Sequence, residues 1–165
     1  MKKIVLFCLV LLTSTVSMAQ ADTTKPYMKK PWLPEISLLS VDSVAFSTKT
    51  VAKDKNCILM LFNPDCDHCQ KQLNDILAVP GIAQTAQLIM ISVVPLKFNK
   101  EFYEKNHLEK YPFIYLGQDH KAFCGPFFLP YTIPALAFYN SKGQFVSIHY
   151  GNMDSKEVAA SLKKL

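Results

Sequence analysis

Residues 57–69 read CILMLFNPDCDHC, a continuous apolar run followed closely by two cysteines. The run at 57–62 has the length and composition of a strand buried on both faces of a sheet. It ends at Asn63-Pro64, because proline cannot donate to a strand ladder. Apolar side chains then recur at helical spacing at Cys69, Leu73, Ile76 and Leu77. The sequence therefore predicts a buried strand that leads through a tight turn into an amphipathic helix at about 67–79, ended by Pro80 and Gly81.

Apolar patterns on both sides of this unit predict the other elements. Alternation at 36–51 indicates a hairpin or two short strands, and a polar turn at 140–143 indicates another hairpin. We expect strands at 87–94, 113–116, 135–139 and 144–150, and a helix at about 99–108. The segment 117–134 is expected to be irregular, with at most one short helix. A capping box of Asp154 and Glu157 opens a closing helix. This order predicts an α/β fold with a mixed sheet covered by helices on both faces.

Cys66-Asp67-His68-Cys69 places two thiols at the first turn of the expected helix. The unpaired amides and positive dipole end at a helix start favour thiolate over thiol at Cys66, which is therefore the candidate nucleophile. Cys69 lies one turn deeper on the apolar stripe and is expected to attack second. A protonated His68 would add positive charge beside the Cys66 sulfur, whereas Asp65 and Asp67 oppose it. The redox direction therefore stays open.

A Cys-x-x-Cys pair alone is also compatible with half of a zinc site or with a structural disulfide. The buried strand before it and the amphipathic helix after it favour a redox dithiol. A closed zinc site needs two further ligands, and His107, His120 and His149 form no ligand pair along the chain. We expect no bound metal, and the alternative is a copper or zinc chaperone that uses the same cysteines.

The sequence resembles the thioredoxin superfamily, nearest to its exported TlpA-like and redoxin-like members, over residues 37–165. The most specific match is 62–69, and a second is Thr132-Ile133-Pro134. The resemblance implies a thioredoxin-like three-layer α/β/α sandwich with a mixed central sheet. It also implies thiol-disulfide oxidoreductase activity without a metal or organic cofactor. By the same resemblance, Pro134 follows a cis peptide bond and lies against the dithiol, and Ile133 contacts substrate.

Three further positions are interpreted through this resemblance. Gly151 falls where the family has a glycine that allows close approach near the active site. His68 occupies the third position of the DsbA motif, but Asp67 stands where DsbA has proline. Met60 stands where thioredoxins carry a buried acid that relays protons. A proton acceptor must therefore come from elsewhere, with Asp65 the nearest candidate, or from solvent.

Three other cysteines lie outside the motif, and Cys8 is expected to be removed with the N-terminal segment described below. Cys57 begins the strand that Phe62 ends, which puts it roughly 17 Å from the active end at about 3.3 Å per residue. It is expected to be a small buried apolar residue. Cys124 is open to three interpretations: an inert thiol, an additional resolving thiol, or a partner of Cys57 in a disulfide. The aromatic residues nearby form either core or an apolar platform for substrates; they are Phe123, Phe127, Phe128 and Tyr131.

The N-terminal residues predict export. Two lysines, an apolar run at 4–12 and a small-residue site at 17–19 have the form of a secretory signal peptide, so we expect residues 1–19 to be removed. Residues 20–35 contain three prolines and predict an extended arm, followed by one domain at 36–165. The location is then periplasmic or otherwise extracytoplasmic.

Charge limits the partners. The chain has a formal net charge of +5 and contains no arginine, which excludes the bidentate contacts typical of nucleic-acid recognition. Three scattered lysines in the arm allow at most peripheral membrane contact. The expected partners are protein dithiol or disulfide substrates and a protein that recycles the dithiol, and the chain is expected to be a monomer. A third function class stays open, a thioredoxin-like binding domain whose dithiol is not catalytic.

Overall fold

The computed structural model describes residues 25–52 and 54–165, so the expected signal peptide lies outside the described residues. The strands are β1 (Ser37–Ser40), β2 (Ala45–Ser47), β3 (Asn56–Leu61), β4 (Ala86–Ser92), β5 (Ile114–Gln118), β6 (Ala135–Tyr139) and β7 (Phe145–Tyr150). The helices are α1 (Pro26–Lys29), α2 (Thr48–Val51), α3 (Asp67–Leu77), α4 (Ile82–Thr85), α5 (Leu96–Lys105), α6 (Cys124–Phe128) and α7 (Ser155–Leu162), and one 3₁₀ turn covers Leu108–Lys110.

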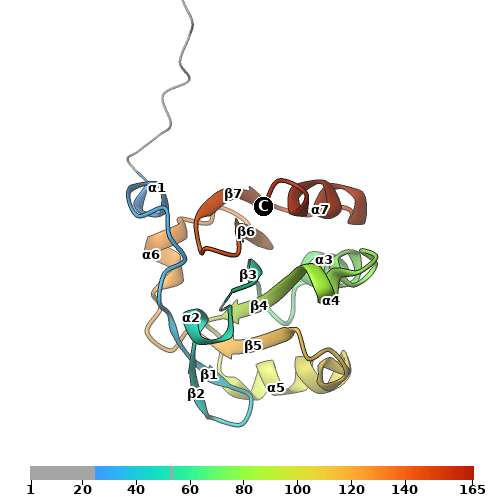
Figure 1. The fold of residues 1–165 in the computed structure, drawn as a ribbon. Coiled ribbons are helices and arrows are strands. Elements are labelled where there is room, and N and C mark those ends of the chain that lie inside the picture. The colour runs from blue at the N-terminus through green and yellow to red at the C-terminus, as the bar shows by residue number, and fades with distance from the viewer. Residues whose placement is uncertain (1–24, 53) are drawn as a thin grey trace, which may run out of the picture.

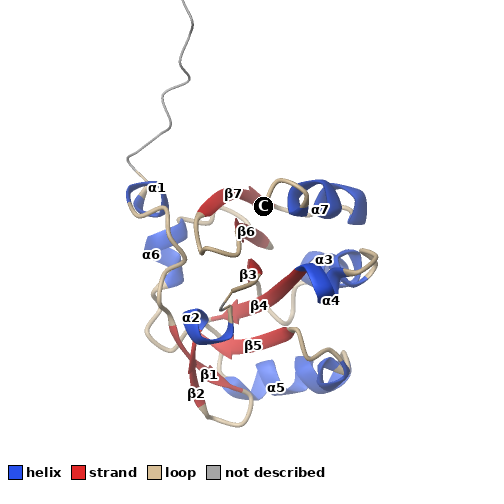
Figure 2. Cartoon of the chain, viewed as in Figure 1, coloured by secondary structure: helices blue, strands red, loops and turns tan. Residues whose placement is uncertain are grey.

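All seven strands form one mixed sheet in the order β2-β1-β5-β4-β3-β6-β7. The central strands β3, β4 and β5 are parallel, and β1 and β6 pair antiparallel to them. The edge strands β2 and β7 pair antiparallel to β1 and β6. Helices α3, α5 and α7 cover one face, and α1, α2 and α6 lie on the other (Figures 1 and 2). This is the predicted three-layer α/β/α sandwich with a mixed central sheet.

Alternating side chains of the central strands build a separate core on each face. Because successive residues of a strand point to opposite faces, Ile58 and Met60 join the core under α3, whereas Cys57, Leu59 and Leu61 join the core under α6. β4 alternates in the same way, and every residue of this strand is buried. Burial on both faces explains why these strands read as continuous apolar runs in the sequence.

The arm at 25–35 differs from the extended tether that its prolines predict. It begins with the helical turn α1, in which Pro26 takes a first-turn position that tolerates a missing amide proton. Tyr27 and Leu33 are buried in the α6-side core, and Trp32 forms an isolated bridge with Gln144. The described part of the arm is therefore packed against the domain, because its two apolar side chains gain more from burial than from exposure.

Two short helices were not expected from the sequence. α2 follows directly after β2, and α4 follows the turn at Gly81, where φ is +72°. The capping box that opens α7 is present as predicted: the Glu157 amide donates to the Asp154 side chain at 2.9 Å, and the Asp154 amide donates to Glu157 at 2.7 Å.

The strand register brings three segments that are distant in sequence to one edge of the sheet. Leu61 at the end of β3 pairs with Ala135 at the start of β6, and Ala135 also pairs with Tyr150 at the end of β7. The turn after β3, the peptide before β6 and the loop after β7 therefore lie together. No helix among the described residues is both long and apolar enough to span a membrane.

Candidate active site: a dithiol at the start of α3

Cys66 is the N-cap residue of α3, and its sulfur takes part in the cap. The Cys69 amide lies 3.3 Å from Cys66 Sγ and 2.9 Å from the Cys66 carbonyl, so the sulfur shares this donor with the backbone oxygen of its own residue. The Cys66 amide in turn donates to the Asn63 carbonyl at 3.1 Å, which fixes the turn between β3 and α3. Cys66 is partly exposed.

Cys69 differs from Cys66 by complete burial. Its relative exposure is 0%, and it lies in the core between α3 and the sheet. Burial raises the pKa of the Cys69 thiol to about 12; a backbone hydrogen bond with Asn63 lowers it in part, and the neighbouring Cys66 sulfur raises it again. At neutral pH the second sulfur is therefore a protonated thiol behind an accessible one.

The peptide bond between Ile133 and Pro134 is cis, as the resemblance implied. Pro134 directly precedes β6, whose first residue pairs with the last residue of β3, so it lies at the edge of the sheet that carries the dithiol. The Pro134 carbonyl accepts from the Gly151 amide at 2.8 Å. Ile133 is partly buried and packs against the α3-side core, to which Cys66 also packs.

Gly151 takes φ of +91°, and a Cβ built on it would meet no atom within 4 Å. These open surroundings agree with a plain turn glycine, the alternative to a close approach of this chain. Glycine is suited to this position because the backbone adopts the left-handed region that side chains disfavour. The resulting turn directs the chain from β7 back toward the start of α3.

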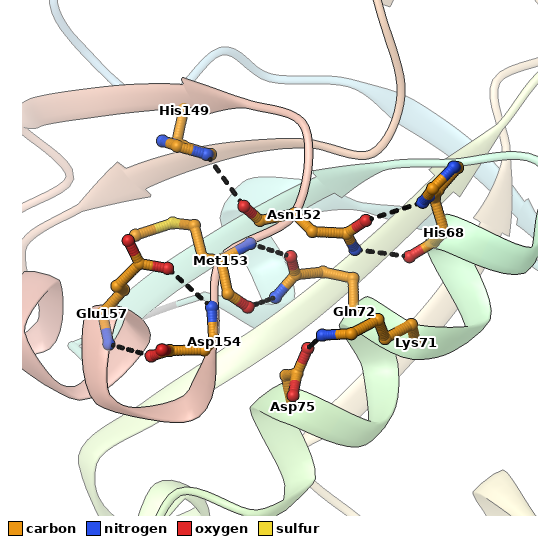
Figure 3. A network of polar contacts seen from close by, with 9 residues as sticks. All are labelled: His68, Lys71, Gln72, Asp75, His149, Asn152, Met153, Asp154 and Glu157. Atoms are coloured by element: carbon orange, nitrogen blue, oxygen red, sulfur yellow. Dashed lines mark hydrogen bonds and ion pairs between the residues drawn. The ribbon is translucent and has the colours of Figure 1, made fainter.

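The loop after β7 binds the start of α3 through paired side-chain contacts (Figure 3). The Asn152 Nδ2 donates to the His68 carbonyl at 2.6 Å, and its Oδ1 lies 3.0 Å from the His68 Nδ1. Gln72 Oε1 accepts from the Met153 amide at 2.7 Å, and Gln72 Nε2 donates to the Met153 carbonyl at 3.1 Å. The first turns of α3 are therefore fixed by the C-terminal loop.

Asn152 and Gln72 were missed by the sequence analysis. Gln72 is fully buried although it lies in the middle of a helix, and glutamine is an ordinary surface residue of helices. Asn152 follows a glycine, which marks a turn but gives no indication of its partner. Only the long-range pairing of β6 with β7 brings this loop to α3.

The structure defines the surroundings of Met60 and Asp65, the two positions considered for proton transfer. Met60 is fully buried, so the place of the acid that thioredoxins carry is filled by an apolar side chain. Asp65 is exposed, and its amide donates to the Asn63 side chain at 3.0 Å in the turn before Cys66. It remains close to the dithiol in sequence and open to solvent.

Cys57 and Cys124 belong to the opposite face of the sheet. Both thiols are free and buried in the core under α6. Burial raises the pKa of each thiol well above its ordinary value, and the nearby Asp119 carboxylate raises that of Cys124 further. The Cys124 amide donates to Asp119 at 2.7 Å. This arrangement agrees with the inert interpretation of both residues and does not join them in a disulfide.

The aromatic segment before Pro134 divides between core and surface. Phe127 and Phe128 are buried, whereas Phe123 and Tyr131 are exposed, Tyr131 by 80%. The core interpretation therefore holds for the two helical residues only. Within the described residues, no group of three or more His, Cys, Asp or Glu side chains is placed to hold a metal ion.

Comparisons with known proteins identify the fold. No protein-family model matches the chain, and no curated protein matches its sequence. Among solved structures, an uncharacterized thioredoxin-like protein from Porphyromonas gingivalis matches with a TM-score of 0.66 and 21% identity, over 86% of this chain and 93% of that one. A secreted Mycobacterium tuberculosis disulfide oxidoreductase, described as homologous to E. coli DsbE, matches with a TM-score of 0.64 and 16% identity. The match covers 79% of this chain and 96% of that one.

A third match is the exposed lipoprotein thioredoxin Etrx1 of Streptococcus pneumoniae, with a TM-score of 0.61 and 20% identity over 80% of this chain and 100% of that one. Each match covers nearly the whole of the other chain. The protein therefore has the thioredoxin-like fold, as the resemblance at residues 62–69 and 132–134 implied.

Proposed function

We propose that this protein is a thiol-disulfide oxidoreductase that exchanges disulfides with protein substrates through Cys66 and Cys69. The observation that carries the proposal is the asymmetry of the two sulfurs. Cys66 Sγ is partly exposed and accepts from a helix-start amide, whereas Cys69 is a buried thiol directly behind it. This pairing gives one sulfur to attack a substrate and one to resolve the product. The matched solved structures, which include oxidoreductases, support the same function.

In the reductive direction the Cys66 thiolate attacks one sulfur of a substrate disulfide. The substrate S–S bond breaks, a mixed disulfide forms, and the first substrate sulfur leaves as a thiolate that takes up a proton. Cys69 then loses its proton and attacks Cys66 Sγ, which releases the second substrate sulfur. Two electrons pass to the substrate, and the enzyme ends with a Cys66–Cys69 disulfide. The oxidative direction is the reverse, with a substrate dithiol as electron donor.

The cis-proline segment is the proposed substrate contact. Ile133 precedes Pro134 at the edge of the sheet that also carries Cys66, and Ile133 is proposed to offer backbone to an extended substrate chain while Pro134 lies against the dithiol. His68 and Asp65 complete the proposed site, as a charge beside the nucleophile and as a solvent-exposed proton acceptor. No metal and no organic cofactor enters any step.

We further propose export of the chain and removal of residues 1–19, on the sequence pattern described above. The Mycobacterium tuberculosis match is described as secreted and the Streptococcus pneumoniae match as exposed, which supports an extracytoplasmic location. The proposed partners are protein substrates and a separate protein that restores the redox state of the dithiol. The proposed state in solution is a monomer with a domain at 36–165.

The test is disulfide exchange by residues 20–165. Insulin reduction with dithiothreitol as electron source is expected to accelerate, and Cys69→Ser is expected to accumulate a mixed disulfide at Cys66, which mass spectrometry detects. Cys57→Ala is the matched control and leaves both results unchanged. Tight stoichiometric copper(I) or zinc binding without insulin reduction would instead favour a metal chaperone. Failure of both assays would favour a binding domain.

A further inference from the structure

Asn152 contacts both the ring and the backbone of His68, the residue directly before Cys69. The two hydrogen bonds join residues 84 positions apart, at 3.0 Å to the ring and 2.6 Å to the carbonyl (Figure 3). The oxygen and the nitrogen of the Asn152 side-chain amide thus both contact one exposed residue, through its ring and its backbone carbonyl. Such a paired contact fixes an orientation that one bond would leave free.

The orientation of the Asn152 amide determines which nitrogen of His68 carries a proton. A backbone carbonyl only accepts, so the NH₂ group of Asn152 must face the His68 carbonyl. Its Oδ1 then faces the ring and requires a donor. The His68 Nδ1 is therefore protonated, and Nε2 is the nitrogen that gains or loses the second proton.

The neighbours of Asn152 hold it in this place from both sides. The Gly151 amide donates to the carbonyl of Pro134, and Met153 exchanges two hydrogen bonds with the buried Gln72. The carbonyl of Asn152 lies 3.2 Å from the His149 Nε2. The contacts of the loop therefore hold the Asn152 side-chain amide in place independently of its hydrogen bonds with His68.

We propose that Asn152 is a positioning residue of the dithiol, which acts through His68 and makes the Cys66–Cys69 couple more oxidising. This inference rests on the proposed function. The Asn152 oxygen bonds a charged imidazole more strongly than a neutral one, and a positive charge beside a thiolate stabilises the reduced form of the couple. The carboxylates of Asp65 and Asp67 counteract the effect of this charge on the thiolate. On the opposite side, His149 Nε2 lies 3.2 Å from the Asn152 carbonyl.

The first experiment determines the tautomer of His68 without any assay of activity. The ¹⁵N chemical shifts of its ring are measured by NMR at about pH 8, where a histidine with an ordinary titration is neutral. In the unmodified chain Nδ1 is expected to be protonated and Nε2 bare. Asn152→Ala is expected to move the proton toward Nε2. A bare Nδ1 in the unmodified chain, or the same tautomer in both proteins, would overturn the proposal.

The second experiment is a double-mutant cycle on the redox equilibrium with glutathione at about pH 6. Asn152→Ala is expected to lower the equilibrium constant for reduction of the enzyme disulfide about threefold, which is about 14 mV for a two-electron couple. In a His68→Ala background the same substitution is expected to change nothing. An equal change in both backgrounds would show that Asn152 acts on the fold and not through His68.

The control is Asn140→Ala, which removes a similar set of turn hydrogen bonds in the β6–β7 hairpin, away from the dithiol. It is expected to leave both the tautomer and the equilibrium constant unchanged. The two experiments fail separately: a chain without disulfide exchange refutes the proposed function, whereas the NMR measurement still decides the role of Asn152 at His68.

Discussion

The described residues contain two pairs of cysteines on opposite faces of one sheet, and only one of the pairs includes a partly exposed thiol. Cys66 caps a helix and is partly exposed, with buried Cys69 behind it. Cys57 and Cys124 are buried among aliphatic and aromatic side chains under α6. The difference teaches that access and position at a helix start, rather than the presence of a second cysteine, distinguish the pair proposed to exchange disulfides.

The largest expected difference between substitutions in the two cysteine pairs is in catalysis. Cys66→Ser is expected to lower the rate of insulin reduction by at least about 1,000-fold, because the hydroxyl is a far weaker nucleophile than a thiolate. Cys57→Ala is expected to change the rate by less than about twofold, since that sulfur lies on the other face. Turbidity assays on both variants measure the two rates. Comparable losses in both would contradict the division between the pairs.

A smaller contrast is expected in chemical labelling. Iodoacetamide at about pH 7 is expected to alkylate Cys66 at least about 100-fold faster than Cys57 or Cys124, because burial keeps the latter two protonated and out of reach. Peptide mass spectrometry of the folded chain at timed intervals gives the individual rates. Labelling in denaturant, where all thiols react alike, provides the reference. Early labelling of Cys124 in the folded chain would revive its interpretation as a resolving thiol.

The smallest expected effect concerns stability in alkaline solution. The pKa of Cys57 is raised by burial, so the folded chain holds this proton more tightly than the unfolded chain does. Stability from this group is therefore complete below about pH 8.5 and falls as the pH rises further. Cys57→Val is expected to reduce the slope of the free energy of unfolding between about pH 9 and 10, by at most about 1.4 kcal/mol per pH unit.

Urea unfolding at a series of pH values measures this slope. The unmodified chain provides the reference slope. An unchanged slope in Cys57→Val would show that this thiol is not enclosed in the folded chain, and the contrast between the two pairs would be wrong.

Most of the layered architecture could be predicted because the strands that matter are buried on both faces. β3 and β4 appear in the sequence as apolar runs, and the helix after them appears through its spacing. Short α2 and α4 could not be predicted in the same way, since four residues are too few to show a helical period. The packed arm was missed because its prolines are visible locally, whereas the pocket for Tyr27 is made by distant residues.

The candidate site divides along the same line. Cys66, Cys69 and Pro134 lie in short motifs, so their places could be inferred from neighbours in the chain and from resemblance. Asn152 and Gln72 act through pairing across the sheet, which no local pattern encodes. The sequence therefore indicates the positions of Cys66 and Cys69, but not those of Asn152 and Gln72, whose contacts hold the start of α3.

The register that joins β3, β6 and β7 also sets an order in time. The cysteines are synthesised near the middle of the chain, but the loop that holds their helix start follows β7 and emerges only near the end. The first turns of α3 can therefore make their contacts with Asn152 and Met153 only after almost the whole chain has been synthesised.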